Sequence, residues 1–234
     1  MSELIVALDM QNLDDVKSIV KEFDKKVDFY KVGMELFYSE GRRAIEYLKN
    51  ENKKVFLDLK LHDIPNTVLK GLISLANLNV DILNVHASGG FSMMKFANES
   101  LKEFCYKKNL IIPKLIAVTI LTSIGDEDYE KIGYKTDVKN QVLNLAKLTK
   151  KAGLDGVVAS VLEANLIKQN LGENFLIITP GIRPNFANIN DQNRIASPSE
   201  AIKNGATHLV IGRALTLAND KLKALEEILK EMEI

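Results

Sequence analysis

Residues 55–63 read Val-Phe-Leu-Asp-Leu-Lys-Leu-His-Asp, an apolar run that carries two carboxylates and one lysine toward its end. Such a run predicts a buried strand, in which successive side chains point to opposite faces. Asp58 and Lys60 should therefore lie side by side at the carboxyl end of the strand, with Asp63 on the loop beyond. Charge is unfavourable in a buried strand, so the arrangement indicates a functional site. A lysine held between two carboxylates stays an ammonium and can face a position where negative charge develops.

Seven further runs of this kind repeat along the chain, and the starts of all eight lie about 29 residues apart on average. The seven are residues 4–9, 28–33, 82–87, 114–121, 156–160, 176–180 and 208–212. Helical patterns lie between them, with apolar stripes within residues 13–23, 138–152 and 218–232. This spacing fits one strand and one helix per unit. Eight units predict an α/β fold, a (β/α)8 TIM barrel that forms a single domain over residues 1–234.

An open, doubly wound sheet is the structural alternative. Its dinucleotide-binding glycine fingerprint is absent after the first strand, which favours the barrel. Two connections are longer than a short loop needs, at residues 122–137 and 181–197. Long loops in compact domains are often lids or binding loops, and in a barrel both would open on the face that carries active sites.

Composition excludes several classes of function. The 31 basic and 31 acidic residues cancel, which argues against a nucleic-acid partner or a polybasic membrane surface. Cys105 is the only cysteine, so no internal disulfide forms, and its apolar neighbours predict an inert core thiol. The apolar stretch of residues 110–121 is broken by Pro113 and Lys114, which leaves no membrane span. We expect a soluble, cytoplasmic protein.

Polar side chains close most of the predicted strands. In chain order they are Asp9, Lys31, Asp58 with Lys60, His86, Thr122, Arg183 and Arg213. The carboxyl ends of all strands in a barrel open on one face. Any one of these residues alone would fit a solvated strand end or a structural ion pair. Together they predict a ring of alternating charge around a shared cavity.

The last two strands each end in a glycine close to an arginine. Residues 179–184 read Thr-Pro-Gly-Ile-Arg-Pro, and residues 211–214 read Ile-Gly-Arg-Ala. Barrels often bind phosphate here, with loop amides and a helix N-terminus facing the anion. Glycine permits close approach of the backbone, and arginine supplies a planar fork for phosphate oxygens. We favour a phosphate site; two ordinary turns with exposed arginines are the alternative.

The three histidines do not predict a metal site. His62, His86 and His208 are not spaced as a metal cluster, and neither H-E-x-x-H nor C-x-x-C occurs. We expect His208 to open a strand at the opposite face of the barrel and to be structural. His62 is expected on a loop, and His86 either orients its neighbours or is a satisfied core histidine.

Five segments, taken in order, make the chain resemble the orotidine 5′-phosphate decarboxylase family. They are residues 58–67 (Asp-Leu-Lys-Leu-His-Asp-Ile-Pro-Asn-Thr), 118–123 (Val-Thr-Ile-Leu-Thr-Ser), 179–184, 191–194 (Asp-Gln-Asn-Arg) and 211–213. The Asp-x-Lys-x-x-Asp element alone is shared with sister barrels of different chemistry, whereas the combination is specific. The resemblance implies conversion of orotidine 5′-phosphate to uridine 5′-monophosphate and carbon dioxide in pyrimidine biosynthesis, without a cofactor or metal.

The resemblance also implies a role for each matching residue. Lys60 would protonate C6 of the pyrimidine, flanked by Asp58 and Asp63, with Asp58 near the departing carboxylate. Asp9 and Lys31 would hold the ribose hydroxyls, and Thr122 would meet the pyrimidine. The phosphate would be held, and the lid closed, by Arg183, Gln192, Gly212 and Arg213. A homodimer is implied in which Asp63 and Thr67 reach into the neighbouring subunit's site.

Two other functions remain open at this point. The first is a sister barrel that acts on sugar phosphates through a magnesium-stabilised enediolate, such as a 3-keto-gulonate 6-phosphate decarboxylase or a hexulose-phosphate synthase. The Asp191-Gln192 segment favours the nucleotide decarboxylase over these. The second is a non-catalytic barrel that binds a phosphorylated ligand, which would leave the grouping of Asp58, Lys60 and Asp63 unexplained.

Overall fold

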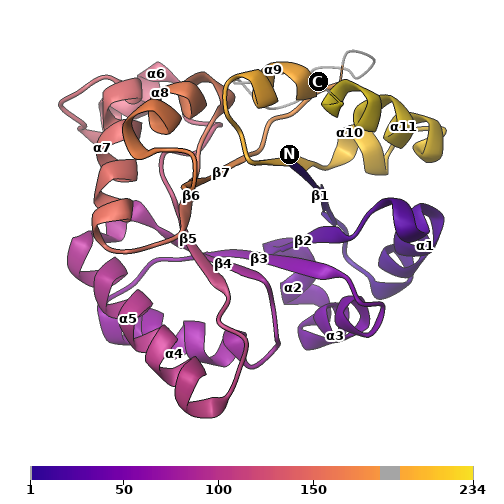
Figure 1. Ribbon diagram of the computed structural model, residues 1–234, viewed down its shortest axis with the longest axis horizontal. Helices are drawn as coiled ribbons and strands as arrows, with labels where there is room; N and C mark the ends of the chain where they lie inside the picture. The colour runs from indigo at the N-terminus through magenta and orange to yellow at the C-terminus, as the bar shows by residue number, and fades with distance from the viewer. Residues whose placement is uncertain (1, 185–195, 234) are drawn as a thin grey trace.

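The computed structural model describes residues 2–184 and 196–233 of the 234-residue chain, and in it eight parallel strands close into a barrel (Figure 1). The strands pair in chain order and β8 returns to β1. Their bounds are β1 Glu3–Ala7, β2 Phe29–Gly33, β3 Lys54–Leu61, β4 Ile82–His86, β5 Lys114–Val118, β6 Gly156–Val158, β7 Leu176–Thr179 and β8 His208–Ile211. Each predicted run overlaps one of these strands, so the predicted fold class is confirmed.

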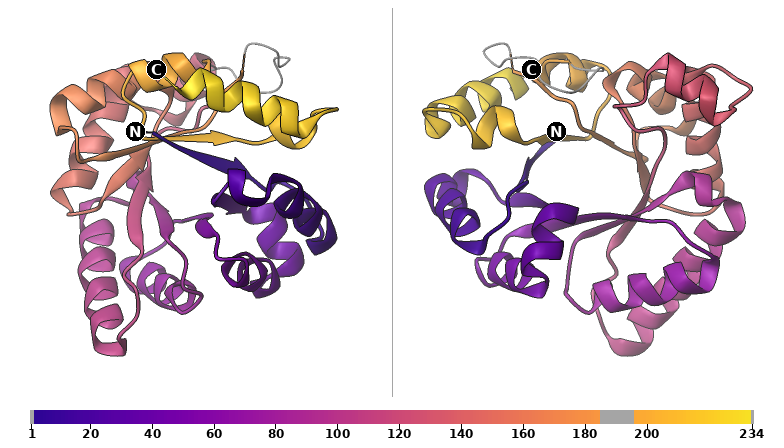
Figure 2. Two further views of the ribbon diagram at one scale, coloured as in Figure 1. Left: turned by 45° about the vertical axis from the view of Figure 1, so that its right-hand side comes forward. Right: turned by 180° about the vertical axis from the view of Figure 1, so that it is seen from behind.

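Helices form the outer ring, as both views in Figure 2 show. They are α1 Leu13–Phe23, α2 Met34–Glu40, α3 Arg42–Asn50, α4 Pro65–Ala76, α5 Phe91–Lys108, α6 Asp126–Ile132, α7 Val138–Lys151, α8 Val161–Leu171, α9 Pro198–Lys203, α10 Arg213–Thr216 and α11 Lys221–Met232, with short 3-10 turns at Asp24–Lys26 and Ala87–Gly89. Helix α6 lies within residues 122–137, so this connection is not the continuous loop that we predicted. Gly125 precedes it and Gly133, with φ of 88°, ends it, which is a common way to terminate a helix.

The core has two parts because strand side chains alternate between faces. Inside the barrel lie Ile5, Ala7, Phe29, Phe56, Ile82, Ile116, Ile178 and Val210. The larger part fills the space between strands and helices, and it includes Leu57, Leu83 and Cys105. Cys105 is fully buried, as predicted from its apolar neighbours. The barrel interior is therefore packed with side chains, so space for a ligand is expected beyond the strand ends.

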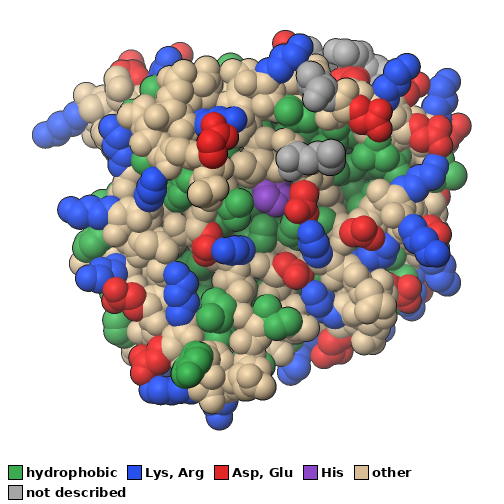
Figure 3. Space-filling view, in the orientation of Figure 1, with side chains coloured by type: hydrophobic (Ala, Val, Ile, Leu, Met, Phe, Trp, Pro, Cys, Tyr) green, Lys and Arg blue, Asp and Glu red, His purple; other side chains and the backbone are tan. Residues whose placement is uncertain are grey.

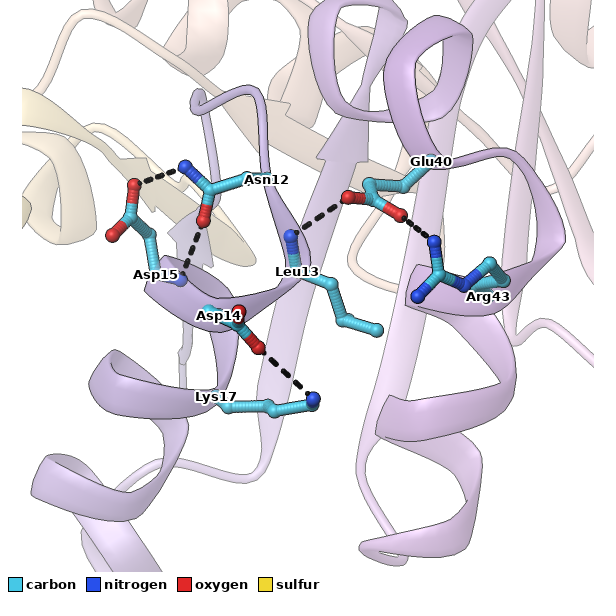
Figure 4. A network of polar contacts seen from close by, with 7 residues as sticks. All are labelled: Asn12, Leu13, Asp14, Asp15, Lys17, Glu40 and Arg43. Carbon is cyan, nitrogen blue, oxygen red and sulfur yellow. Dashed lines mark hydrogen bonds and ion pairs between the residues drawn. The ribbon is translucent and has the colours of Figure 1, made fainter.

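The loop after β1 is held at the start of α1 by a polar network (Figure 4). Asn12 Oδ1 accepts from the backbone N–H of Asp15 at 2.9 Å, which caps the helix. Glu40, at the end of α2, accepts from the backbone N–H of Leu13 at 3.0 Å and pairs with Arg43 at 2.9 Å. These contacts anchor α1 to the α2–α3 unit. They fix the loop that begins with Asp9.

Side chains of both charges are mixed on one face of the molecule (Figure 3). On the face drawn in Figure 3, basic and acidic side chains are interspersed, in keeping with the 31 residues of each sign. No helix of the described residues has the length and hydropathy needed to cross a lipid bilayer.

Candidate active site at the carboxyl ends of the barrel strands

The central feature of the site is a bulge near the end of β3. The register against β4 shifts between Leu57 and Leu61, and Lys60 lies in the left-handed region with φ of 52°. For a residue with a Cβ this conformation costs about 1–2 kcal/mol. Asp58 and Lys60 lie side by side as predicted, but regular strand alternation is not the reason. The bulge turns the Lys60 side chain toward Asp58, which is a common use of bulges beside active sites.

Four side chains at the ends of three neighbouring strands form a row of alternating charge. Lys31 Nζ, from β2, lies 2.8 Å from Asp9 Oδ1 and 3.7 Å from Asp58 Oδ2. Lys60 Nζ lies 2.8 Å from Asp58 Oδ1. Each carboxylate or ammonium therefore has a neighbour of opposite sign, and the row ends on the ammonium of Lys60.

Asp58 is held as a carboxylate although it is only 8% exposed. Burial is the largest single influence and would raise its pKa. The ammonium groups of Lys60 and Lys31, with hydrogen bonds from Lys60 and Asn84, outweigh burial and leave the pKa below its usual value. A buried carboxylate between two ammonium groups stays ionised, so its negative charge can act on a reaction that changes charge nearby.

Eight predicted site residues line one cavity of about 300 Å³, at the lower end of the usual size range for small-molecule sites. They are Asp9, Lys31, Asp58, Lys60, Thr122, Arg183, Gly212 and Arg213. Arg183 is buried in its wall, and its Nη1 donates to the carbonyl of Ile182 at 3.1 Å. Apolar side chains such as Ile120, Val158 and Ile178 line the same cavity. The predicted shared cavity is present, with an ionic side, two arginines and an apolar wall.

Of the three remaining predicted site residues, two lie outside the cavity and one lies outside the described residues. Asp63 is exposed, and its Oδ1 accepts from the backbone N–H of Ile64 at 2.6 Å; together with His62 it lines a separate, open depression. Thr67, in the first turn of α4, is exposed as well. Gln192 lies outside the described residues. Within one chain, Lys60 therefore has Asp58 as its carboxylate partner, and no ion pair with Asp63 occurs among the described residues. Flanking by Asp63 of a neighbouring subunit stays a prediction.

The strand-end histidine does not join the cavity. His86 is absent from the described residues that line it and instead faces His62, with ring centroids 5.4 Å apart. Burial, His62 and Lys60 lower the pKa of His86, against an opposing effect of Asp58. At the opposite end of the barrel, His208 opens β8, contacts Phe29 edge to face and hydrogen-bonds Thr207 Oγ1 through Nδ1 at 2.9 Å. The prediction that His208 lies at the far face is confirmed.

Two glycines lie where the backbone approaches the ionic row. A Cβ on Gly33 would lie 2.8 Å from Lys31 Nζ and 3.3 Å from Asp9 Oδ1. A Cβ on Gly212 would be in ordinary contact with Asp9 Oδ2, at 3.4 Å. Gly33 thus leaves room for the ion pair between β1 and β2.

Sequence reasoning missed Asn84. This residue is fully buried on β4, donates to Asp58 Oδ1 at 2.6 Å and accepts from the backbone N–H of Lys60 at 2.8 Å. The signal was available, because a lone amide stands between Leu83 and Val85 in a strand that is otherwise apolar up to His86. No group of three or more His, Cys, Asp or Glu side chains suited to a metal ion occurs within residues 2–184 and 196–233.

A closed barrel whose strand ends gather two lysines, two carboxylates and two arginines around one cavity defines a (β/α)8 protein with a candidate site for a charged ligand. Residues 2–228 match the family described as orotidine 5′-phosphate decarboxylase / HUMPS family, and the chain belongs to that family.

Named relatives agree over the whole length. An orotidine 5′-phosphate decarboxylase of Carboxydothermus hydrogenoformans is 48% identical over 235 residues, which cover 100% of this chain and 97% of that protein. One of Trichlorobacter lovleyi is 45% identical over 232 residues, covering 99% and 95%. A crystal structure of orotidine 5′-phosphate decarboxylase from Lactobacillus acidophilus is similar, with a TM-score of 0.87, 41% identity and full coverage of both chains.

Proposed function

We propose that this chain is a carboxy-lyase that converts orotidine 5′-monophosphate to uridine 5′-monophosphate and carbon dioxide in pyrimidine nucleotide synthesis. The observation that carries the proposal is the ammonium of Lys60, held 2.8 Å from a buried carboxylate at the edge of the cavity. Family membership supplies the substrate, since the relatives described above are named for this activity.

The reaction leaves a difficult intermediate. When the bond between C6 and the carboxyl group breaks, the electron pair stays in the plane of the ring, where the π system cannot absorb it. Lys60 answers this need in two ways: its positive charge stabilises the carbanion, and its Nζ then donates a proton to C6. Carbon dioxide leaves, uridine 5′-monophosphate forms, and solvent returns a proton to the amine.

Asp58 has two roles in this scheme. It positions Lys60 through the 2.8 Å ion pair, and it places a fixed negative charge beside the departing carboxylate. Because Asp58 is buried and stays ionised, the substrate carboxylate meets repulsion that ends when it leaves as neutral carbon dioxide. Lys31 prevents the cluster from carrying uncompensated negative charge.

The other lining residues account for the rest of the nucleotide. Asp9 and Lys31 hold the ribose hydroxyls, and Thr122 meets the pyrimidine. Arg183, Gly212 and Arg213 hold the phosphate at the ends of β7 and β8, and Gln192 joins them from the segment outside the described residues. Binding energy gained at the phosphate can drive enclosure of the reacting ring, which excludes water from the charged row.

We propose a homodimer in which Asp63 and Thr67 complete the neighbouring subunit's site. Both residues are exposed, and Asp63 does not reach Lys60 of its own chain. Two exposed apolar side chains contribute to the surface of this region: Ile64, which adjoins Asp63, is 67% exposed, and Phe96, on the helix packed against α4, is 43% exposed. Such a surface is suited to association. We further propose a single domain and a cytoplasmic location, which the lone buried thiol of Cys105 supports.

One experiment tests the activity. The ultraviolet absorbance of orotidine 5′-phosphate should decay to that of uridine 5′-monophosphate when purified protein is added, at the same rate with and without EDTA. A decay that EDTA abolishes would favour a magnesium-dependent sister activity. Binding without turnover would favour a non-catalytic ligand-binding barrel.

A further inference from the structure

We propose that Asn84 is a positioning residue that holds Asp58 and Lys60 in their working arrangement. This inference rests on the proposed decarboxylation, since it concerns how the proton donor of that reaction is placed. Asn84 is fully buried in the middle of β4. It therefore acts on the substrate only through the two residues that it contacts.

The two hydrogen bonds of Asn84 require an amide in one orientation. Asp58 Oδ1 is a carboxylate oxygen and can only accept, so the group 2.6 Å away must be the amide NH₂. The backbone N–H of Lys60 can only donate, so the group 2.8 Å away must be the amide oxygen. A carboxylate would place an acceptor against Asp58, and an apolar side chain would leave both partners without these bonds.

The contact with Lys60 lies at the strained point of the chain. Lys60 has a φ of 52°, and the register between β3 and β4 shifts between Leu57 and Leu61, which lie on either side of it. Its backbone N–H is bound by the Asn84 side chain, which replaces a regular ladder partner. Asn84 thus fixes the backbone that aims the lysine and, at the same time, the carboxylate that pairs with its ammonium.

Several charged groups surround position 84. From β3 it faces Asp58 and Lys60. Asp58 is in turn 3.7 Å from Lys31 of β2, which pairs with Asp9 beyond β1. On β4, His86 lies close enough to Asp58 and Lys60 to be influenced by both, and it faces His62. On β5 the residue in register with Asn84 is Ile116, which is apolar.

The Asn84→Asp variant tests the role through its pH dependence. When the introduced carboxyl is protonated, it can donate to Asp58 as the amide does, so turnover should approach that of the parent. When it ionises, two carboxylates face each other and Lys60 is displaced. A displacement of 1 Å can reduce rate by about 10²-fold. We expect kcat relative to the parent to fall by this order as pH rises from acid to mildly alkaline, with KM changing far less.

Asn98→Asp is the matched control. Asn98 is also a buried asparagine; it lies on α5 and does not line the cavity. Its side chain donates to the backbone carbonyl of Gly153 at 2.8 Å. Its replacement should affect thermal stability without changing the shape of the pH–kcat profile. A loss in Asn84→Asp that does not vary with pH, or that matches the control, would overturn the inference.

Asn84→Ala provides a second test if the aspartate variant does not fold. It removes both bonds without adding charge, so kcat should fall by a similar factor at every pH; kcat equal to that of the parent would overturn the inference. The proposed function fails separately, if the parent protein itself does not convert orotidine 5′-phosphate. In that case NMR tests the positioning role, because the backbone amide of Lys60 donates to Asn84. The nitrogen-15 chemical shift of this amide should differ between the parent and Asn84→Ala, and an unchanged shift would overturn the inference.

Discussion

The Nζ atom of Lys60 lies 2.8 Å from Oδ1 of Asp58, and the two residues occupy the same strand end. This pair joins the two requirements of the proposed reaction, a cation near the developing negative charge and a proton to deliver. Because Asp58 is buried and also approached by Lys31, the pair is held from both sides. Loss of either member therefore changes the charge balance of the whole row.

Replacing Lys60 should separate charge from proton donation. Lys60→Ala removes both, and we expect kcat to fall by at least about 10⁴-fold, since general acid catalysis and electrostatic stabilisation each contribute 10²-fold or more. Lys60→Arg keeps a cation near Asp58 but supplies a guanidinium that hardly releases its proton. It should bind uridine 5′-monophosphate and still turn over poorly. Steady-state kinetics and product titration measure both effects, and near-parental kcat in the arginine variant would contradict proton donation by Lys60.

Gly33→Ala should reduce activity without unfolding the protein. The added methyl group would lie 2.8 Å from Lys31 Nζ, so the end of this flexible side chain must move away from Asp9. We expect a loss of about 10- to 10²-fold in kcat/KM, because groups that contact substrate tolerate little displacement. Gly125→Ala is the control, since its methyl group meets nothing within 4 Å. A Tm change larger in Gly33→Ala than in the control, with kcat/KM unchanged, would contradict this reading.

The even spacing of apolar runs in the sequence is enough to predict most of the fold and much of the site. Apolar runs at even spacing predict eight strands, and topology alone then brings Asp9 and Arg213, which are 204 positions apart in sequence, to one cavity. The bulge at Lys60 could not be predicted from the sequence. Its backbone is in the left-handed region, and a lysine, unlike a glycine, does not signal that conformation. The predicted place of His86 in the ring of charge around the cavity was wrong. The chain turns after β4, and the His86 ring packs against His62 instead of lining the cavity.

Arg213→Ala should lose efficiency only toward phosphorylated substrate. Arg213 lines the cavity at the end of β8, and an arginine–phosphate contact contributes a strong, charge-assisted hydrogen bond. We expect kcat/KM for orotidine 5′-phosphate to fall by about 10²-fold or more, whereas the slow reaction of orotidine, which lacks the phosphate, should be the same in both proteins. An equal loss on both substrates would mean that Arg213 acts elsewhere than at the phosphate.

Mixing two inactive variants tests the shared site. Lys60→Ala and Asp63→Ala homodimers should each be nearly inactive. A heterodimer would have one site that contains Lys60 of one chain and Asp63 of the other, so activity should return toward half of the parental value per heterodimer. Subunit exchange is verified with two distinguishable tags. If heterodimers form and stay inactive, the exposed position of Asp63 does not reflect a role in the neighbouring site.

The histidines at the two ends of the barrel should make the fold sensitive to mild acid. Burial is the main cause of the lowered pKa of His86 and also of His208, where Glu3 opposes and Lys54 adds to it. In the unfolded chain both titrate near 6.5. As pH falls, the unfolded state therefore binds protons before the folded state does. The two histidines make their whole contribution to the free energy of unfolding above about pH 6.5, and this contribution declines as pH falls toward the folded-state pKa values.

Removing these side chains should flatten the acid limb of the stability curve. Because the two histidines lie at opposite ends of the barrel, their effects should add. We expect His86→Gln and His208→Gln each to lose less Tm than the parent between pH 7.5 and pH 5.5, and the double variant to lose least, whatever their stabilities at pH 7.5. Calorimetry over this range measures the differences. A double variant with the parental pH dependence would assign the acid sensitivity to other groups, and the two rings would then be protonated as easily in the folded chain as in the unfolded chain.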